Sequence, residues 1–106
     1  MMRRSREEII ADILEAVDND INRISSIMRN VNLSASLAKK YLKALTDNGL
    51  IVEINGEYKL TEKGRRLLES MRNIRKMEVE LITLMNYIKK EISLTNDVKK
   101  QVNNSS

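Results

Sequence analysis

Three lysines, Lys39, Lys40 and Lys43, stand on one side of a stretch with helical periodicity and could contact the phosphates of a polyanion. The stretch runs from Leu33 to Ile51 and reads LSASLAKKYLKALTDNGLI, with apolar residues at the three-and-four spacing of a helix that buries one face. Lysine contacts phosphate as a point charge, whereas arginine is better suited to bidentate recognition of guanine. The residue types therefore favour contacts with a nucleic-acid backbone over direct reading of bases.

This basic segment is delimited at both ends. Ser34 offers a hydroxyl to the first free N–H groups of the helix, and Gly49 supplies the left-handed residue that ends it before a strand begins. The face that we expect to be buried consists of Leu37, Tyr41, Leu42 and Leu45. We interpret the segment as a recognition helix.

Two helices are predicted before this segment. The first runs from Arg6 to Asp18 and begins with a capping box, in which Ser5 caps the helix and Glu8 reaches back to it. A short second helix follows a polar turn, with Ser25 as its cap. The connection at residues 31–33 is so short that it must be a tight turn. A short helix, a tight turn and a basic-faced helix form a helix-turn-helix.

The period then changes from helical to strand-like. Residues 51–54 and 57–60 flank Asn55-Gly56, and Asn-Gly between such runs is a strong signal for a two-residue hairpin, because both turn positions need positive φ. A hairpin directly after a helix-turn-helix is a wing, which completes a winged helix. We therefore predict a mainly α fold with a small β-hairpin (α+β), a winged helix-turn-helix domain over residues 1–64.

A long helix is predicted after the hairpin, over about residues 62–93, with Thr61 as its cap. Its apolar residues alternate steps of four and three, which is the spacing of a coiled-coil seam, and one charged residue, Glu78, interrupts them. We assign residues 65–94 to a dimerisation coiled-coil helix and residues 95–106 to a polar, disordered tail. A helix that folds back over its own domain is the alternative.

Glu78 also indicates the direction in which two such helices pair. In a parallel, in-register dimer it would face its own symmetry mate, and two like charges in a partly desolvated seam are costly. An antiparallel homodimer pairs Glu78 with Leu81 instead, and Arg75 one turn away could neutralise the carboxylate. The predicted dimer interface consists of Leu67, Met71, Ile74, Met77, Glu78, Leu81, Leu84, Met85, Ile88 and Ile92.

Composition argues against several classes of protein. The 106 residues include no cysteine and no histidine, which removes disulfides, thiol nucleophiles, most zinc sites and the commonest general base. The sequence also lacks Gly-rich phosphate loops, an apolar run long enough to span a bilayer, and a signal-peptide segment. We therefore expect a cytoplasmic protein, associated with the nucleoid if DNA is its partner, that is not an enzyme and uses no metal, cofactor, membrane or small-molecule substrate.

The net charge of +4 is distributed unevenly along the chain. The first helix is acidic, whereas lysine and arginine outnumber the acidic residues from Ile21 to Arg66. One side of the domain should therefore be positive and suit double-stranded DNA, although a mixed solvated surface is the alternative. A winged-helix module that binds a protein instead of DNA is the competing interpretation. The predicted DNA contacts are Arg29, Asn30, Asn32, Ser34, Ser36, Lys39, Lys40, Lys43 and Lys59.

A series of short matches, in order and spacing, links the chain to a known family. The matches are Ile27-Met28, Val31-Asn32-Leu33-Ser34, Lys40-Tyr41-Leu42, Leu45, Gly49-Leu50-Ile51, Tyr58 and Leu60-Thr61-Glu62-Lys63-Gly64-Arg65. Over about residues 4–68 the chain resembles the archaeal winged-helix family that includes the ten-kilodalton crenarchaeal chromatin protein, which has a C-terminal antiparallel coiled coil.

The resemblance implies an archaeal or archaeal-virus source, a homodimer, and double-stranded DNA as the partner. It also implies a role as a chromatin protein or as a regulator of transcription. After Ser34 the chain departs from the family pattern, because Ala35 and Ser36 stand where members often carry an aromatic and a long polar residue. This departure implies only a modest preference for DNA sequence.

Overall fold

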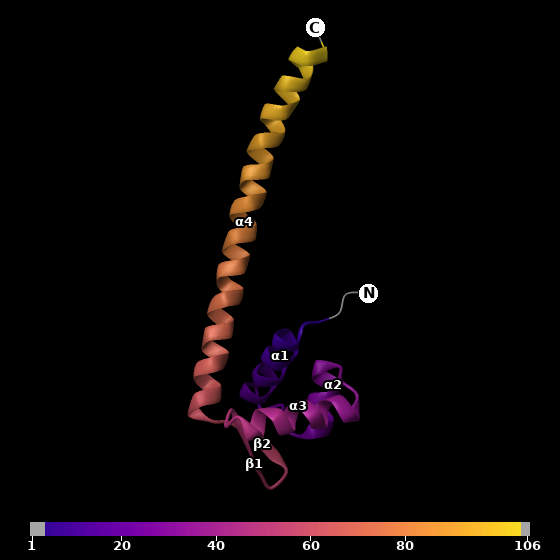
Figure 1. The fold of residues 1–106 in the computed structure, drawn as a ribbon, viewed down its shortest axis with the longest axis vertical. Coiled ribbons are helices and arrows are strands. Elements are labelled where there is room, and N and C mark those ends of the chain that lie inside the picture. The colour runs from indigo at the N-terminus through magenta and orange to yellow at the C-terminus, as the bar shows by residue number, and fades with distance from the viewer. Residues whose placement is uncertain (1–3, 105–106) are drawn as a thin grey trace. The chain divides into compact units, whose positions relative to one another are not determined.

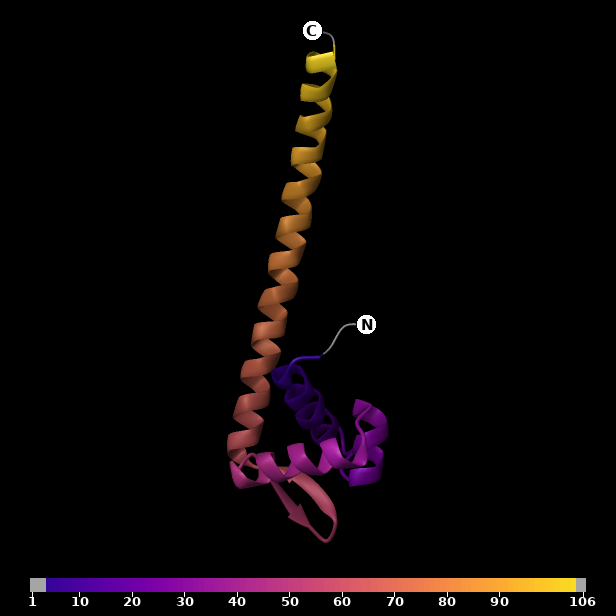
Figure 2. The ribbon, with the colours of Figure 1, turned by 45° about the vertical axis from the view of Figure 1, so that its right-hand side comes forward.

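Six elements make up the part of the chain that the computed structural model describes, residues 4–104, with side chains described as far as Ser93 (Figures 1 and 2). They are α1 (Arg6–Asp18), α2 (Ile24–Val31), α3 (Ala35–Asp47), β1 (Ile51–Ile54), β2 (Glu57–Leu60) and α4 (Glu62–Asn104). The chain divides into a compact unit that ends at Met71 and a second unit that begins at Arg72. The predicted fold class, mainly α with a small β-hairpin and a long C-terminal helix, is confirmed.

Side-chain caps start α1 and α3 where the sequence predicts them. The Ser5 hydroxyl accepts a hydrogen bond of 3.1 Å from the N–H of Glu8, and the Glu8 carboxylate accepts one of 3.4 Å from the N–H of Ser5. The Ser34 hydroxyl accepts a hydrogen bond of 3.3 Å from the N–H of Leu37. The predicted capping box and the start of the basic helix are therefore confirmed.

A left-handed residue follows each of the three short helices. These residues are Asp20 (φ 64°), Asn32 (φ 59°) and Gly49 (φ 71°). In each case the next N–H along the chain donates a 2.9 Å hydrogen bond to a carbonyl five residues back, as in a Schellman motif. Glycine, asparagine and aspartate tolerate the left-handed conformation better than other residues, which explains why the chain turns at these points.

The start of α2 corrects the prediction that Ser25 caps this helix. The helix begins at Ile24, and Arg23, in an extended conformation, is the N-cap without a side-chain hydrogen bond. Ser25 is therefore already inside the helix. The hydroxyl of the next residue, Ser26, donates a hydrogen bond of 2.9 Å to the Arg23 carbonyl. Ile24, the first residue of the helix, is partly buried and packs against the core.

One apolar cluster fills the unit that ends at Met71. Its members come from the three short helices, from the turn between α2 and α3, from the first strand and from the beginning of α4. They are Ile13, Leu14, Ala16, Val17, Ile27, Val31, Leu33, Ala38, Leu42, Leu45, Ile51 and Leu68. Because α4 contributes Leu68, the start of the long helix belongs to the winged helix.

Leu37 is not part of this cluster, which corrects the buried face predicted for α3. It is 42% exposed, whereas Ala38 is fully buried and Leu42 and Leu45 are 2% exposed. Tyr41 is partly buried and packs against the cluster. The prediction was wrong because alanine adds little to an apolar stripe read from a sequence, yet its small side chain suits the inward side of a packed helix.

The hairpin matches its predicted residues. Strands β1 and β2 pair antiparallel, with Ile51 opposite Leu60 at the base. Asn55 (φ 53°) and Gly56 (φ 79°) both have positive φ, as a two-residue turn of this kind requires. The wing is attached to the loop before α2 by a hydrogen bond of 2.8 Å from the N–H of Tyr58 to the Asn22 carbonyl.

Several hydrogen bonds join the corner after α3 to the start of α4. The N–H of Thr61 donates to the Leu50 carbonyl at 3.1 Å, and its hydroxyl donates to the Gly49 carbonyl at 2.6 Å. The same hydroxyl accepts a hydrogen bond of 3.0 Å from the N–H of Gly64, which confirms Thr61 as the helix cap. Gly64 lies so close to the Leu50 carbonyl that a Cβ at this position would overlap it.

Helix α4 extends beyond its predicted end. It continues to Asn104 instead of ending at about Ser93. The predicted polar tail, residues 95–106, falls on residues whose side chains lie outside the described part of the chain. From Ile74 to Ile92 the large apolar side chains of α4 are 45% to 62% exposed.

Gly64→Ala should destabilise the winged helix, although alanine in a helix interior is normally about 1 kcal/mol more favourable than glycine. The added Cβ would overlap the Leu50 carbonyl, and relieving such overpacking costs about 1–3 kcal/mol or more. Gly49→Ala is the matched control, because a Cβ there meets open space and the cost comes only from φ 71°. Urea unfolding followed by circular dichroism should show the larger loss for Gly64→Ala. An unfolding free energy at or above that of the wild type would contradict the assignment.

Candidate nucleic-acid interface

The exposed face of α3 carries the residues that the sequence singled out there. Ser36, Lys39, Lys40 and Lys43 are all exposed. Because Ser36, Lys40 and Lys43 recur at i, i+4 and i+7, they form one row on the helix surface, away from the buried stripe, with Lys39 beside it. The Ser34 and Ser36 hydroxyl oxygens lie 3.4 Å apart at the N-terminal end of this row. The structure therefore brings these five predicted contacts together.

Asp47 partly neutralises the basic row at its C-terminal end. Its carboxylate accepts a hydrogen bond of 2.7 Å from the Lys43 ammonium, as an i, i+4 ion pair between two exposed side chains. The hydrogen bond and the attraction of the carboxylate both raise the pKa of Lys43, so this lysine keeps its charge at any physiological pH. A phosphate that approaches Lys43 must compete with Asp47.

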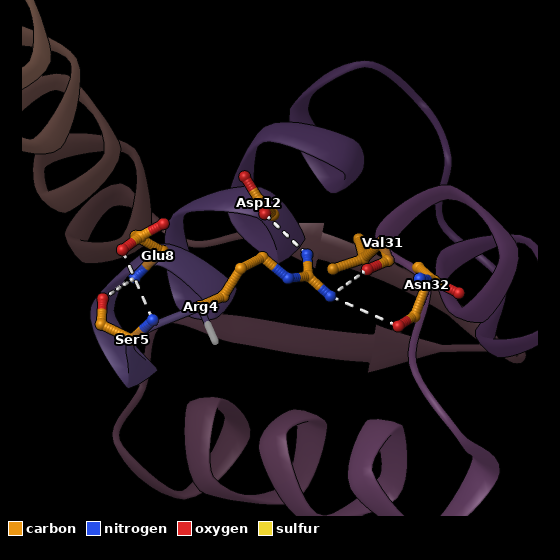
Figure 3. A network of polar contacts seen from close by, with 6 residues as sticks. All are labelled: Arg4, Ser5, Glu8, Asp12, Val31 and Asn32. Carbon is orange, nitrogen blue, oxygen red and sulfur yellow. Dashed lines mark hydrogen bonds and ion pairs between the residues drawn. The ribbon is translucent and has the colours of Figure 1, made fainter. Parts of the chain in front are cut away.

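The side chain of Arg4 donates hydrogen bonds to the turn between α2 and α3 (Figure 3). One guanidinium nitrogen pairs with the Asp12 carboxylate of α1 at 2.9 Å. The other donates to the Val31 carbonyl at 2.6 Å and to the Asn32 carbonyl at 3.3 Å. The guanidinium thus satisfies carbonyls at the end of α2 and attaches the turn to α1. Arg4 therefore helps to set the position from which α3 starts.

Arg29 and Asn32 flank the start of α3. Arg29 is exposed in the last turn of α2, and Asn32 is the exposed left-handed residue of the turn. Both side chains are therefore accessible to a ligand. Their contacts with DNA remain predictions.

Asn30 and Lys59 lie in surroundings of mixed charge instead. Asn30 lines a pocket with Asp12 and Glu15, and Lys59 lines another with Asp18, Asp20 and Arg65. Arg4 pairs with Asp12 and Arg65 pairs with Asp18, so the negative charge of these carboxylates is partly neutralised. The contacts of Asn30 and Lys59 with DNA stay predictions.

Arg23 is a candidate that the sequence did not single out. Its guanidinium pairs with the Glu57 carboxylate at 3.4 Å and lies 3.7 Å from where a Cβ of Gly56 would be, so a cation covers the turn of the wing. Across the two strands, Glu53 is opposite Tyr58, and Ile54 is opposite Glu57. Burial and the nearby Glu53 carboxylate raise the pKa of Tyr58, which keeps its hydroxyl protonated at neutral pH. The positive charge of Arg23 therefore partly offsets the negative charges of Glu53 and Glu57 in the wing.

The predicted dimer interface divides into two parts. Leu67 and Met71 are partly buried against the core of the winged helix. The later apolar positions are exposed: Ile74, Met77, Leu81, Leu84, Met85, Ile88 and Ile92. Within the part of the chain with described side chains, Glu78 forms no ion pair with Arg75, so the neutralisation that the sequence suggested is not seen.

Neither a metal nor a membrane is indicated by the described residues. Over this part of the chain, no group of three or more Asp and Glu side chains is arranged to hold a metal ion. Over the same part, no helix combines the length and the apolar character that crossing a bilayer requires.

A family model and one curated relative match the chain. The model, described as winged helix-turn-helix, matches residues 3–79. An uncharacterised protein of Methanocaldococcus jannaschii is 36% identical over 73 residues, which are 69% of this chain and 35% of that protein. The chain thus spans about a third of the length of this curated relative.

Solved structures that are similar to the chain include a DNA-binding protein and a methyltransferase. Sso10a-2, a DNA-binding protein from Sulfolobus solfataricus, has a TM-score of 0.66 at 25% sequence identity, over 82% of this chain and 95% of that chain. The O-methyltransferase NcsB1 from neocarzinostatin biosynthesis has a TM-score of 0.50 at 22% identity over 56% of this chain and 20% of its own, a likeness of fold alone. The family model and the Sulfolobus structure confirm the resemblance to archaeal winged-helix proteins. The chain belongs to the winged helix-turn-helix family.

Proposed function

We propose that the chain binds double-stranded DNA through α3, mainly by contacts with phosphates, and that it does so as a homodimer. The observation that carries the proposal is the exposed row of Ser36, Lys40 and Lys43 on α3, with Lys39 beside it. The second helix of a helix-turn-helix enters the major groove, with its N-terminal residues toward the base edges. Sso10a-2, a protein of similar fold, is a DNA-binding protein.

The residue types on α3 support phosphate contacts over base reading. The helix contains no arginine, asparagine or glutamine, whose planar side chains are suited to bidentate contacts with guanine or adenine, and its lysines are point charges without that planar geometry. Lysines and serine hydroxyls instead reach phosphate oxygens and position the protein on the duplex. Affinity should therefore depend strongly on salt, and sequence preference should be modest.

This binding mode suits an architectural chromatin protein, which covers DNA with little selection for sequence. A regulator of transcription is the second role that the proposal includes. Either role places the protein in the nucleoid. Genome-wide occupancy distinguishes them, because a chromatin protein covers the chromosome broadly and a regulator occupies a few promoters.

The apolar side of α4 supports the homodimer. A helix with exposed apolar residues at steps of three and four gains stability when it packs against a second such helix. In the antiparallel arrangement Leu67 meets Ile92, Met71 meets Ile88, Ile74 meets Met85 and Glu78 meets Leu81, while Met77 meets Leu84 at the flank. A second copy of the chain supplies this partner with no further protein required.

Lys40→Ala should weaken binding to all duplexes to a similar degree. The logarithm of affinity should fall linearly with the logarithm of salt concentration, with a slope of about −0.9 per phosphate neutralised. Removal of one phosphate contact should lower the steepness of that slope by about 0.9 for each bound winged helix. Fluorescence anisotropy with a random-sequence duplex, between about 50 and 200 mM salt, measures this slope.

Lys76→Ala is the control for this experiment, because it removes the same charge from an exposed position of α4. It should leave the salt slope unchanged. If the wild-type chain does not bind duplex DNA at low salt, or binds it independently of salt, the DNA proposal fails. The alternative, a winged-helix module that binds a protein, would then be favoured.

Asp47→Asn should tighten duplex binding by several-fold at low salt. The substitution releases Lys43 from its 2.7 Å ion pair and removes a negative charge from the basic row. The gain should be smaller in a Lys43→Ala background, because the released cation is then absent. Anisotropy titrations of the two single variants and the double variant give this coupling. An equal gain in both backgrounds would show that Asp47 acts by general repulsion alone.

Glu78→Leu should stabilise the homodimer by about 1–4 kcal/mol, because it replaces an unpaired charge in the seam by an apolar side chain. Glu80→Leu is the control, since position 80 lies outside the seam. Thermal unfolding at several protein concentrations, together with light scattering, measures the effect. A monomer at tens of micromolar would exclude the dimer, and a lower melting temperature for Glu78→Leu would show that this carboxylate has a stabilising partner.

A further inference from the structure

Leu37 is the large apolar side chain that α3 leaves exposed. It is 42% exposed, while Ala38 next to it is fully buried. Ala44, seven residues further along the helix, is also exposed. Leu37 and Ala44 therefore lie on one apolar line beside the row of Lys40 and its neighbours.

The position of Leu37 gives its exposure a specific consequence, although single exposed leucines are common on proteins. It is the third residue of α3, in the first turn, which is the part of a recognition helix that faces base edges. Its N–H already donates to the Ser34 hydroxyl at 3.3 Å. What Leu37 can offer to a ligand is therefore its apolar side chain.

The major groove of DNA presents one apolar group, the C5-methyl of thymine. Other base edges present hydrogen-bond donors and acceptors, which lose water beside a leucine without gaining a partner. We infer that Leu37 contacts thymine methyl groups in the major groove and gives this protein a preference for thymine-containing DNA. The inference rests on the proposed function, since it requires α3 to lie in the major groove.

Different side chains of α3 then determine the affinity for DNA and the preference for thymine. Lys39, Lys40 and Lys43 contact phosphates, which are the same in every sequence. Leu37 stands beside Lys40, one helical turn away, so a phosphate contact of Lys40 holds the leucine close to the base edges. Removal of Leu37 should therefore change which duplex is preferred without a change in the salt slope.

Thymine methyl groups can be removed without a change in the protein. The wild-type chain is titrated at constant salt with an alternating A·T duplex and with the same duplex in which uracil replaces thymine. Uracil keeps the hydrogen-bonding groups of thymine and lacks only the C5-methyl. Burial of one methyl group corresponds to a difference of about fourfold, so the uracil duplex should bind about twofold to fourfold more weakly.

A second comparison of two duplexes adds a methyl group instead of removing one. A G·C duplex is compared with one that contains 5-methylcytosine, which carries a methyl at the same ring position. The methylated duplex should bind about twofold to fourfold more tightly. Agreement between the two pairs excludes an effect of A·T content on DNA shape as the cause.

Leu37→Ser should abolish both differences, so that it binds the duplexes of each pair equally. Val52→Ser is the matched control, because Val52 is similarly exposed, at 40%, but lies on the wing. This control should keep the wild-type response to the methyl groups. Circular dichroism checks that each variant is folded, and the comparison of duplexes with the wild-type chain does not depend on any variant.

The outcomes separate this inference from the proposed function. Salt-dependent binding with equal affinity for thymine and uracil duplexes overturns the role of Leu37 and leaves DNA binding intact. A difference that persists in Leu37→Ser also overturns it, because another residue then contacts the methyl groups. Absence of binding to any duplex overturns both proposals.

Discussion

The close approach of Gly64 to the Leu50 carbonyl is the constraint on which the rest of the winged helix depends. Only a residue without a Cβ allows the start of α4 to lie against the corner that follows α3. Thr61 completes this junction, because its hydroxyl and N–H both bond to carbonyls of the corner. The junction brings Leu68 into the core, so one backbone contact connects the basic helix, the wing and the long helix.

The position of α3 results from polar contacts at its start and apolar contacts along its length. Arg4 attaches the turn before α3 to α1, through two carbonyls and the Asp12 carboxylate. Ala38, Leu42 and Leu45 then turn toward the core and determine which side chains face outward. Because these buried side chains set the rotation of the helix, the lysines and Leu37 are exposed together.

The exposed surfaces of α3 and α4 are suited to different kinds of interaction with a partner. Charges on α3 attract a polyanion over a distance of roughly one Debye length, about 8–10 Å, and this attraction weakens with salt. Apolar side chains on α4 gain stability only when water is removed from them, with little dependence on salt. Our proposals assign DNA to the first surface and a second copy of the chain to the other.

The helices, the strands and most of their ends could be predicted from residue types and spacing. Ser5, Ser34, Thr61 and the Asn55-Gly56 turn were correctly identified because caps and turns depend on residues that are close along the chain. Which side chains lie outside the core, and which distant charges come into contact, depends on the folded structure. Ala38 is buried in the core where Leu37 was predicted to be, and this depends on how closely α3 packs against the rest of the core. The contact of Arg23 with Glu57 joins residues far apart in sequence. Local patterns do not contain that information, because it arises when the whole core is assembled.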